Sequence, residues 1–340
     1  MDFGFSDEQQ EIKATAREFL ASRFPPSKVR ELAEAGAYDP QLWTEIADLG
    51  WPGIAIGEEH GGQGLGLLEL VILCEELGYA CAPTPFLSNA AAGLMLAAAG
   101  SEAQRERLLP SLAAGEALGT VGVVGEGGGA PLVADAQDAA FVLLAGPDGA
   151  VVAERAEAEV EALDVIDATR RYARVSASGG DPLPGEVSAG ADRIAVATAA
   201  ELTGIAQRAM EMAVDYAKER EQFGRPIGAY QAVSHRCAQM LYDTEEARSL
   251  TYYAAWTADA EPESLPLAAA MAIARATDAA WSVTNASLQV HGGIGFTWEH
   301  DLHFLLKRAR ATAALLGDAA AARQRVAELS GLGAGAPAPA

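Results

Sequence analysis

The stretch REQFGRPIGAYQ, residues 220–231, separates two long segments that both have the apolar spacing of helices. Gly224 can adopt the left-handed conformation that ends a helix, and Pro226 prevents the helix from continuing. The stretch therefore predicts a tight turn between two antiparallel helices in the second half of the chain.

The residues around this turn exceed what a helix end needs, because an arginine, a glutamine and a phenylalanine gather there (Arg220, Gln222 and Phe223). One explanation is structural: the arginine compensates the helix dipole and the phenylalanine fills the end of a helix bundle. The other explanation is that these side chains bind a ligand.

A second segment, QVHGGIGF at residues 289–296, ends a later predicted helix with paired glycines. Glycines let a backbone approach a ligand closely, and their amide groups can bind phosphate. One glycine pair is weak evidence. Its occurrence together with the 220–231 turn, in the same helical half of the chain, favours the explanation in which both segments bind a ligand.

Hydrophobic periodicity divides the chain into three parts and a tail. Helical patterns fill the first third, where Ser6 and Ser101 have the sequence context of helix caps. Short β-like runs follow at 117–125, 139–154 and 171–178, with GPDG at 146–149 as a hairpin turn. Four helices are then predicted at 194–220, 229–258, 266–290 and 301–329, as an antiparallel bundle. The expected fold is mainly α with a small β domain: 1–116 helical, 117–189 a short middle β domain, 190–330 a four-helix bundle and 331–340 a disordered tail.

Composition excludes several classes of function. A net charge of −23 over 340 residues argues against nucleic-acid binding, which requires basic faces. No apolar run approaches the roughly 20 residues that span a bilayer, and the N-terminus lacks a signal-peptide pattern. Cys74, Cys81 and Cys237 lie in apolar helical patterns, so we expect buried, reduced thiols and a cytoplasmic protein.

Four segments together resemble the acyl-CoA dehydrogenase family over nearly the whole chain. They are FSDEQQEI (5–12), LGWPGIAIGEEHGGQGLGLLELVILCEELGYACAPTP (49–85), GIAQRAMEMAVDYAKEREQFGRPIGAYQAV (204–233) and LQVHGGIGFTWEHDLHFLLKRARA (288–311). The resemblance implies a helical N-terminal domain, a middle β domain, a C-terminal four-helix bundle and FAD as cofactor.

In that family the RxxFG turn and the QxxGG segment reach across a subunit interface. There they hold the adenosine diphosphate half of the FAD that sits mainly in the neighbouring subunit. The resemblance assigns this role to Arg220, Gln222, Phe223, Gln231, Gln289, Gly292 and Gly293.

Other family features are missing. Family members remove the α-proton of an acyl-CoA with a glutamate, which comes from one of two places in the chain; the corresponding residues here are Leu316 and Ile194. The middle domain lacks a counterpart of the tryptophan–isoleucine–threonine strand that walls the flavin ring, and VGVVGEGGGAPL (121–132) replaces an acidic-proline motif. Two nearby carboxylates, Glu201 and Asp318, are expected to be solvated or to lie at helix ends. His291 is expected to be packed or hydrogen-bonded.

These losses suggest that the chain works with a partner. The hypothesis is an α2β2 acyl-CoA dehydrogenase in which this chain contributes the FAD clamp and a longer related subunit contributes the catalytic glutamate. The chain resembles short subunits of this kind from actinobacterial steroid degradation, so the expected substrate is a steroid side-chain CoA ester. An electron acceptor such as electron-transfer flavoprotein is also expected.

Three alternatives stay open on sequence alone. The chain could be a self-sufficient homomeric dehydrogenase that uses Asp318 or Glu201 as base. It could share the fold but act as a flavin-dependent monooxygenase. It could also be a non-catalytic protein that stabilises a partner and binds no flavin.

Overall fold

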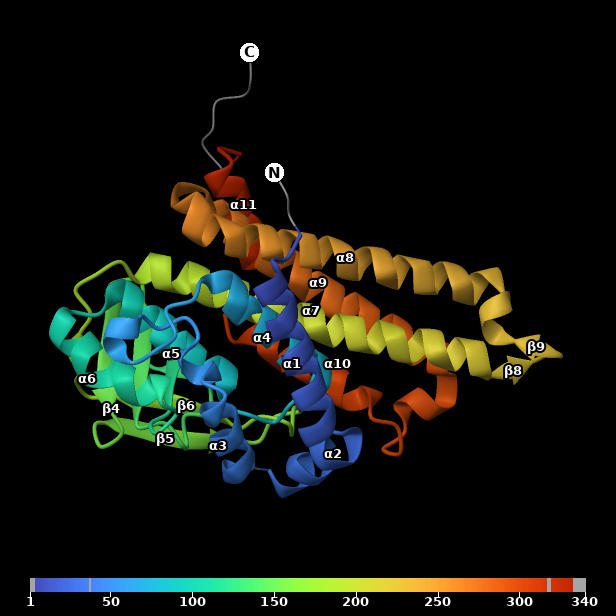
Figure 1. Ribbon diagram of the computed structural model, residues 1–340, viewed down its shortest axis with the longest axis horizontal. Helices are drawn as coiled ribbons and strands as arrows, with labels where there is room; N and C mark the ends of the chain where they lie inside the picture. The colour runs from blue at the N-terminus through green and yellow to red at the C-terminus, as the bar shows by residue number, and fades with distance from the viewer. Residues whose placement is uncertain (1–3, 37, 317–318, 333–340) are drawn as a thin grey trace, which may run out of the picture.

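The computed structural model of the protein describes residues 4–36, 38–316 and 319–332. In chain order it has a helical N-terminal part, a small β part and a set of long C-terminal helices (Figure 1). The predicted fold class is confirmed. None of the helices in these ranges is long and apolar enough to cross a membrane.

The N-terminal helices begin where their caps predict. The Ser6 hydroxyl accepts a hydrogen bond from the Gln9 backbone amide, and the Gln9 side chain accepts one from the Ser6 backbone amide. Ser101 and Gln104 repeat this reciprocal capping. Cys74 and Cys81 are buried as predicted, whereas Cys237 is only half-buried, and all three are free thiols. The helices are α1 (Asp7–Arg23), α2 (Pro26–Ala35), α3 (Pro40–Asp48), α4 (Leu67–Ala80), α5 (Phe86–Ala99) and α6 (Glu102–Ala113), with short 3-10 turns at Trp51–Gly53 and Glu58–His60.

The β part consists of two small sheets. The predicted hairpin is confirmed, since Gly146 pairs with Gly149 across a two-residue turn. The first sheet has the strand order β1-β3-β4-β7, with β1 parallel to β3, and the second has the order β2-β6-β5 and is antiparallel. The strands are β1 (Gly119–Val123), β2 (Ala130–Ala134), β3 (Phe141–Gly146), β4 (Gly149–Glu154), β5 (Ala158–Leu163), β6 (Tyr172–Ala177) and β7 (Asp181–Pro182).

The C-terminal part differs from the prediction in two respects. The helix predicted at 194–220 begins seven residues earlier, at Val187. The segment 301–329 is not one helix, because α10 ends at Ala314 and α11 begins at Ala319. The sequence between them contains a glycine, which is unfavourable inside a helix. The long helices are α7 (Val187–Glu219), α8 (Gln231–Ala260), α9 (Leu265–His291), α10 (Leu302–Ala314) and α11 (Ala319–Leu329), with 3-10 turns at Ile227–Ala229, Pro262–Ser264 and Gly292–Phe296.

Two glycines bring α4 and α7 into backbone contact. A Cβ on Gly204 would lie 1.9 Å from the carbonyl oxygen of Glu75, and a Cβ on Gly78 would lie 2.1 Å from that of Glu201. Any larger residue would therefore force the helices apart. This contact fixes the position of Glu201 of α7 relative to α4.

The predicted domain boundaries remain predictions, although β1 begins three residues after 116 and α7 two residues before 189. Most of the predicted disordered tail, residues 333–340, lies outside the described residues.

Candidate functional site

The turn at 220–231 is a two-stranded hairpin at the end of the long helices. Strand β8 (Glu221–Gln222) pairs with β9 (Arg225–Pro226), and the two turn residues, Phe223 and Gly224, both have positive φ, +53° and +81°. The hairpin extends beyond the ends of α7 and α8, away from the β part (Figure 1).

The Phe223 side chain is 93% exposed, so the structural explanation, in which it fills the end of the bundle, does not hold within this chain. The hairpin is held by its own contacts instead. The Tyr230 hydroxyl donates to the Gln222 carbonyl over 3.1 Å, and the Arg225 guanidinium lies 4.0 Å from the centre of the Tyr230 ring. The tip therefore keeps a defined shape without being packed against the rest of the chain.

The second segment reaches the same end of the molecule. His291, the last residue of α9, stacks on Tyr216 of α7 with the ring centres 4.6 Å apart, and its Nδ1 lies 2.8 Å from the Ser287 carbonyl. Burial lowers the pKa of His291, so the ring is a neutral packed group, as predicted. This contact places the glycine pair, Gly292 and Gly293, beside the last turn of α7 that leads into the hairpin.

The glycine pair is open toward solvent. Gly292 has φ +63° and ψ −138°, a conformation that other residues avoid, and a Cβ on either glycine would meet no atom within 4 Å. The chain's own packing thus does not require glycine there. An external group could approach this backbone closely.

The polar side chains at this end are available for such a group. Arg220, Gln222, Gln231 and Gln289 are all exposed. Within the described part of the chain, no hydrogen bond or ion pair holds the Arg220 guanidinium. The structure thus gathers all seven sequence-predicted residues at one end of the helices, which we call the clamp (Arg220, Gln222, Phe223, Gln231, Gln289, Gly292 and Gly293).

The positions at which a catalytic glutamate was expected lie elsewhere and carry no acid. Ile194 is buried in α7, and Leu316 packs against the edge of the main core. Asp318, one of the two candidate carboxylates, lies outside the described residues.

Glu201, the other candidate, is not solvated and not at a helix end, so that prediction is wrong. It lies in the middle of α7, which begins earlier than predicted, and it is 3% exposed. One carboxylate oxygen accepts from Arg170 over 2.7 Å and from Arg308 over 3.0 Å, while the other accepts from the Thr312 hydroxyl over 3.0 Å.

Burial favours a raised pKa for Glu201, but the two guanidinium groups outweigh it and lower the pKa. The carboxylate is therefore ionised, and both its oxygens are already used. A general base instead needs a free oxygen within reach of a substrate proton. Glu201 is a structural carboxylate.

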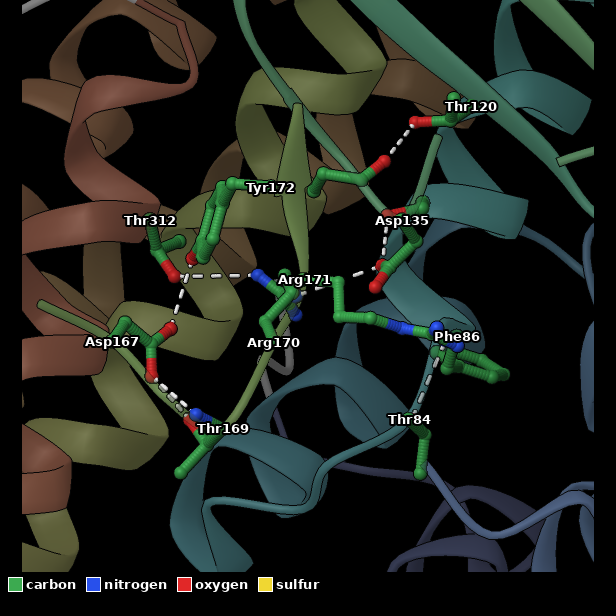
Figure 2. A network of polar contacts seen from close by, with 12 residues as sticks. Thr84, Phe86, Thr120, Asp135, Asp167, Thr169, Arg170, Arg171, Tyr172 and Thr312 are labelled. Atoms are coloured by element: carbon green, nitrogen blue, oxygen red, sulfur yellow. Dashed lines mark hydrogen bonds and ion pairs between the residues drawn. The ribbon is translucent and has the colours of Figure 1, made fainter. Parts of the chain in front are cut away.

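A buried polar network surrounds Glu201 and joins all three parts of the chain. Figure 2 shows the part of this network around Arg170, with Asp135, Asp167, Tyr172 and Thr312. The Tyr172 hydroxyl donates to Asp167 over 2.9 Å, and Asp167 also lies 3.0 Å from Arg308. On the opposite side Asp135, which accepts from Ser88 of α5 over 2.6 Å, is 3.8 Å from Arg170. Burial, only partly offset by Arg170, raises the pKa of Asp135.

The network leaves almost no space beside Glu201. The cavities that border Arg170 each hold about 10 Å³, which is the space of about one water molecule. An acyl chain cannot enter there.

A larger groove, of about 610 Å³, lies outside the network between the second sheet and helices α9 to α11. Five of its lining residues are alanines of the helical wall, which also carries Trp281 and Arg310. Its one carboxylate among the described residues, Asp278, is paired with Arg323 at 2.7 Å.

Sequence reasoning missed Arg170, Asp167 and Arg308. A usable signal existed for Arg308, which lies three residues after Leu305 and four before Thr312 and thus on the apolar face of α10. A charge on such a face requires a buried partner.

Comparison with known proteins agrees with this geometry. The sequence model of the acyl-CoA dehydrogenase N-terminal domain matches residues 6–116, and that of the acyl-CoA dehydrogenase C-terminal domain matches residues 188–330. The first curated relative, the acyl-CoA dehydrogenase IpdE2 of Mycobacterium tuberculosis, is 35% identical over 91% of this chain and 93% of its own length.

The chain belongs to the acyl-CoA dehydrogenase family.

Solved structures of the family show the same fold. The ChsE4–ChsE5 complex from Mycobacterium tuberculosis matches with a TM-score of 0.89 and 25% identity, covering all of both chains. A variant of the Tcur3481–Tcur3483 steroid ACAD matches with a TM-score of 0.87 and 28% identity, over 95% of this chain and 98% of the other. The region between the two matched domains, 117–187, contains the β part and most of the network.

FAD is the cofactor that family membership assigns, and the clamp fits one half of it. A free guanidinium and open glycine amides suit a diphosphate, while exposed amide side chains and an exposed aromatic ring suit an adenosine. The interior does not supply the catalytic base that the reaction requires. Its only candidate carboxylate among the described residues, Glu201, is ion-paired with two arginines.

Proposed function

We propose that this chain is one subunit of a heteromeric, FAD-dependent acyl-CoA dehydrogenase. In this proposal it holds the adenosine diphosphate half of an FAD whose flavin ring and catalytic glutamate are housed by a longer, related subunit. The observation that carries the proposal is the contrast between the C-terminal end of α7 and its middle. Its C-terminal end leads into an exposed clamp, whereas Glu201 in its middle is sealed in an ion-pair network.

FAD, when bound, supplies the hydride acceptor for α,β-dehydrogenation of the acyl thioester. The clamp residues of this chain bind and orient it. Arg220 would pair with the diphosphate, and the amides around Gly292 and Gly293 would donate hydrogen bonds to the same group. Phe223 would offer a ring face to the adenosine, and the three glutamines of the clamp would offer hydrogen bonds to it.

The α-proton is removed by the partner subunit, since Ile194 and Leu316 cannot accept one. An α2β2 assembly with one FAD for each αβ pair follows if only the partner's flavin sites are complete. The similarity to the ChsE4–ChsE5 complex supports a heteromer, and the similarity to a steroid ACAD supports a steroid CoA thioester as substrate. An acceptor such as an electron-transfer flavoprotein would be needed to reoxidise the cofactor.

The test is to produce the chain alone and together with a longer acyl-CoA dehydrogenase subunit from the same genome. Native mass and FAD absorbance are recorded for both preparations. We expect little or no flavin on the isolated chain and one FAD per αβ pair in the complex. Stoichiometric FAD and acyl-CoA oxidation by the isolated chain would refute the proposal and favour the homomeric alternative.

The complex is then assayed with a steroid side-chain CoA ester and with a short straight-chain acyl-CoA. Preferential turnover of the short substrate would refute the steroid assignment while leaving the subunit role intact.

A further inference from the structure

A cavity of about 330 Å³ lies among the N-terminal helices, apart from the clamp. It is bounded by the junction of α1 and α2, the C-terminal end of α4, the middle of α7 and the start of α10. Its size falls in the range of small-molecule sites, which are mostly apolar with a few placed polar groups. Nothing in the proposed function uses it.

The walls of this cavity are apolar. Leu20 and Phe24 come from α1 and its C-cap, Val29 from α2, Met212 from α7 and Phe304 from α10. Four of these are almost fully buried from solvent, and Met212 is half-buried. The cavity is therefore a preformed space that favours an apolar body.

The charged groups at its rim are paired, with one exception. Arg17 donates to Glu76 over 3.0 Å and stacks on Tyr79 at 3.5 Å, and Asp301 is paired with Arg30. Each of these groups is therefore unavailable to a ligand.

The exception is Arg208 of α7. Its Nη1 has a long contact of 3.3 Å with the Tyr79 hydroxyl, which itself donates to Glu211 over 2.5 Å. No carboxylate lies within 4 Å of the Arg208 guanidinium in the part of the chain that the structure describes. A ligand with one carboxylate would complement this half-buried guanidinium beside an apolar cavity, because a carboxylate can accept two hydrogen bonds from a guanidinium.

We propose that this cavity is a binding site for an amphipathic monocarboxylate, with its apolar body between α1, α2, α7 and α10 and its carboxylate on Arg208. A doubly charged phosphate fits less well, because Glu76, Glu211 and Asp301 are close and the other arginine, Arg17, is engaged. Such acids are the products of thioester hydrolysis, the class of reaction that competes with dehydrogenation for an acyl-CoA. The site would let the subunit sense the free acid.

The test measures binding of decanoate by calorimetry and by thermal shift, using the full chain alone and in its complex. Two probes of the same length serve as references: 1-decanol, which has no charge, and decylamine, whose charge is opposite. We expect decanoate to bind and raise the melting temperature, decanol to bind about 10- to 100-fold more weakly, and decylamine not to bind. Equal binding of decanoate and decanol would overturn the assignment of Arg208.

Two variants locate the site. Arg208→Gln is expected to reduce decanoate affinity about 10- to 100-fold and to leave decanol affinity unchanged. Ala21→Trp, at an exposed lining position, is expected to fill the cavity and abolish binding of both, whereas Ser22→Trp, an exposed neighbour outside the lining, is the matched control. Undiminished binding to Ala21→Trp would overturn the proposal even if Arg208→Gln did not fold. None of these readouts involves FAD, so their failure is distinct from failure of the proposed function.

Discussion

The Glu201 carboxylate lies 3.0 Å from the Arg308 guanidinium in a region from which solvent is excluded. Arg308 also donates through Nη2 to the Thr169 carbonyl over 2.6 Å, so a single side chain of α10 joins α7 to the segment between β5 and β6. The pair therefore holds the parts of the chain together.

Replacing Arg308 by methionine is expected to lower the free energy of unfolding by about 3–5 kcal/mol, because Glu201 and Asp167 would stay buried with too little positive charge. The matched control is Arg174→Met, whose ion pair with Glu161 is exposed and is worth less than about 1 kcal/mol. Urea denaturation followed by circular dichroism measures both. Equal losses would show that the buried network does not stabilise the chain.

Glu201→Gln tests whether this carboxylate takes part in catalysis. A structural role predicts that kcat of the complex changes by less than about twofold at a temperature where both proteins are folded, whereas loss of a general base costs about 10²–10⁴. The same preparation should melt at a lower temperature than the wild type. A large fall in kcat without a change in melting would identify Glu201 as the base.

The clamp predicts a contrast between two arginines of the same hairpin region. Arg220→Ala is expected to weaken FAD binding by the complex about 10- to 100-fold, because a charge-assisted hydrogen bond to the diphosphate is lost. Arg225→Ala, which removes only the contact with Tyr230, is expected to have a much smaller effect. Flavin fluorescence on dilution gives the dissociation constant. If the complex binds FAD equally well with both variants, the result would favour the alternative in which this chain stabilises its partner and binds no flavin.

Gly292 and Gly293 provide a backbone test of the same site. Gly292→Ala forces alanine into a conformation reserved for glycine, at a cost of about 1–3 kcal/mol, so both melting temperature and FAD affinity should fall. Gly293→Ala meets no neighbouring atom in this chain and should leave the melting temperature nearly unchanged. Any loss of FAD affinity in Gly293→Ala then reports a clash with the cofactor itself.

His303 gives the protein a defined acid sensitivity. Burial, aided by the charges of Lys307 and Arg30, lowers the pKa of His303 to about 4. The unfolded chain has an ordinary histidine pKa of about 6.5, so unfolding takes up a proton between these values. Stability from this group is full above about pH 6.5 and is lost progressively as the pH falls to about 4.

We expect His303→Phe, placed between the rings of Trp298 and Phe304, to lose less stability than the wild type between pH 7 and pH 5. Denaturant midpoints at a series of pH values measure the difference. Lys307→Met should raise the pKa of His303 and so narrow the pH range over which stability is lost. Parallel curves for wild type and His303→Phe would contradict this account.

The periodic parts of the fold could be predicted from sequence, since apolar spacing specifies the long helices and GPDG specifies a hairpin. The turn at 220–231 could also be placed, because glycine and proline limit the backbone locally, whereas the role of the clamp residues comes from the family resemblance and stays a prediction. The network could not, since Arg170 and Glu201 are 31 residues apart and meet only through tertiary packing. The break after Ala314 was missed because the segment keeps helical spacing on both sides of it.

The exposed phenylalanine at the tip of the hairpin has a consequence for the amount of this protein in the cell. A copy without the proposed partner subunit would leave Phe223 accessible to chaperones and proteases. The cellular level of the unpartnered chain should therefore follow the level of the partner subunit.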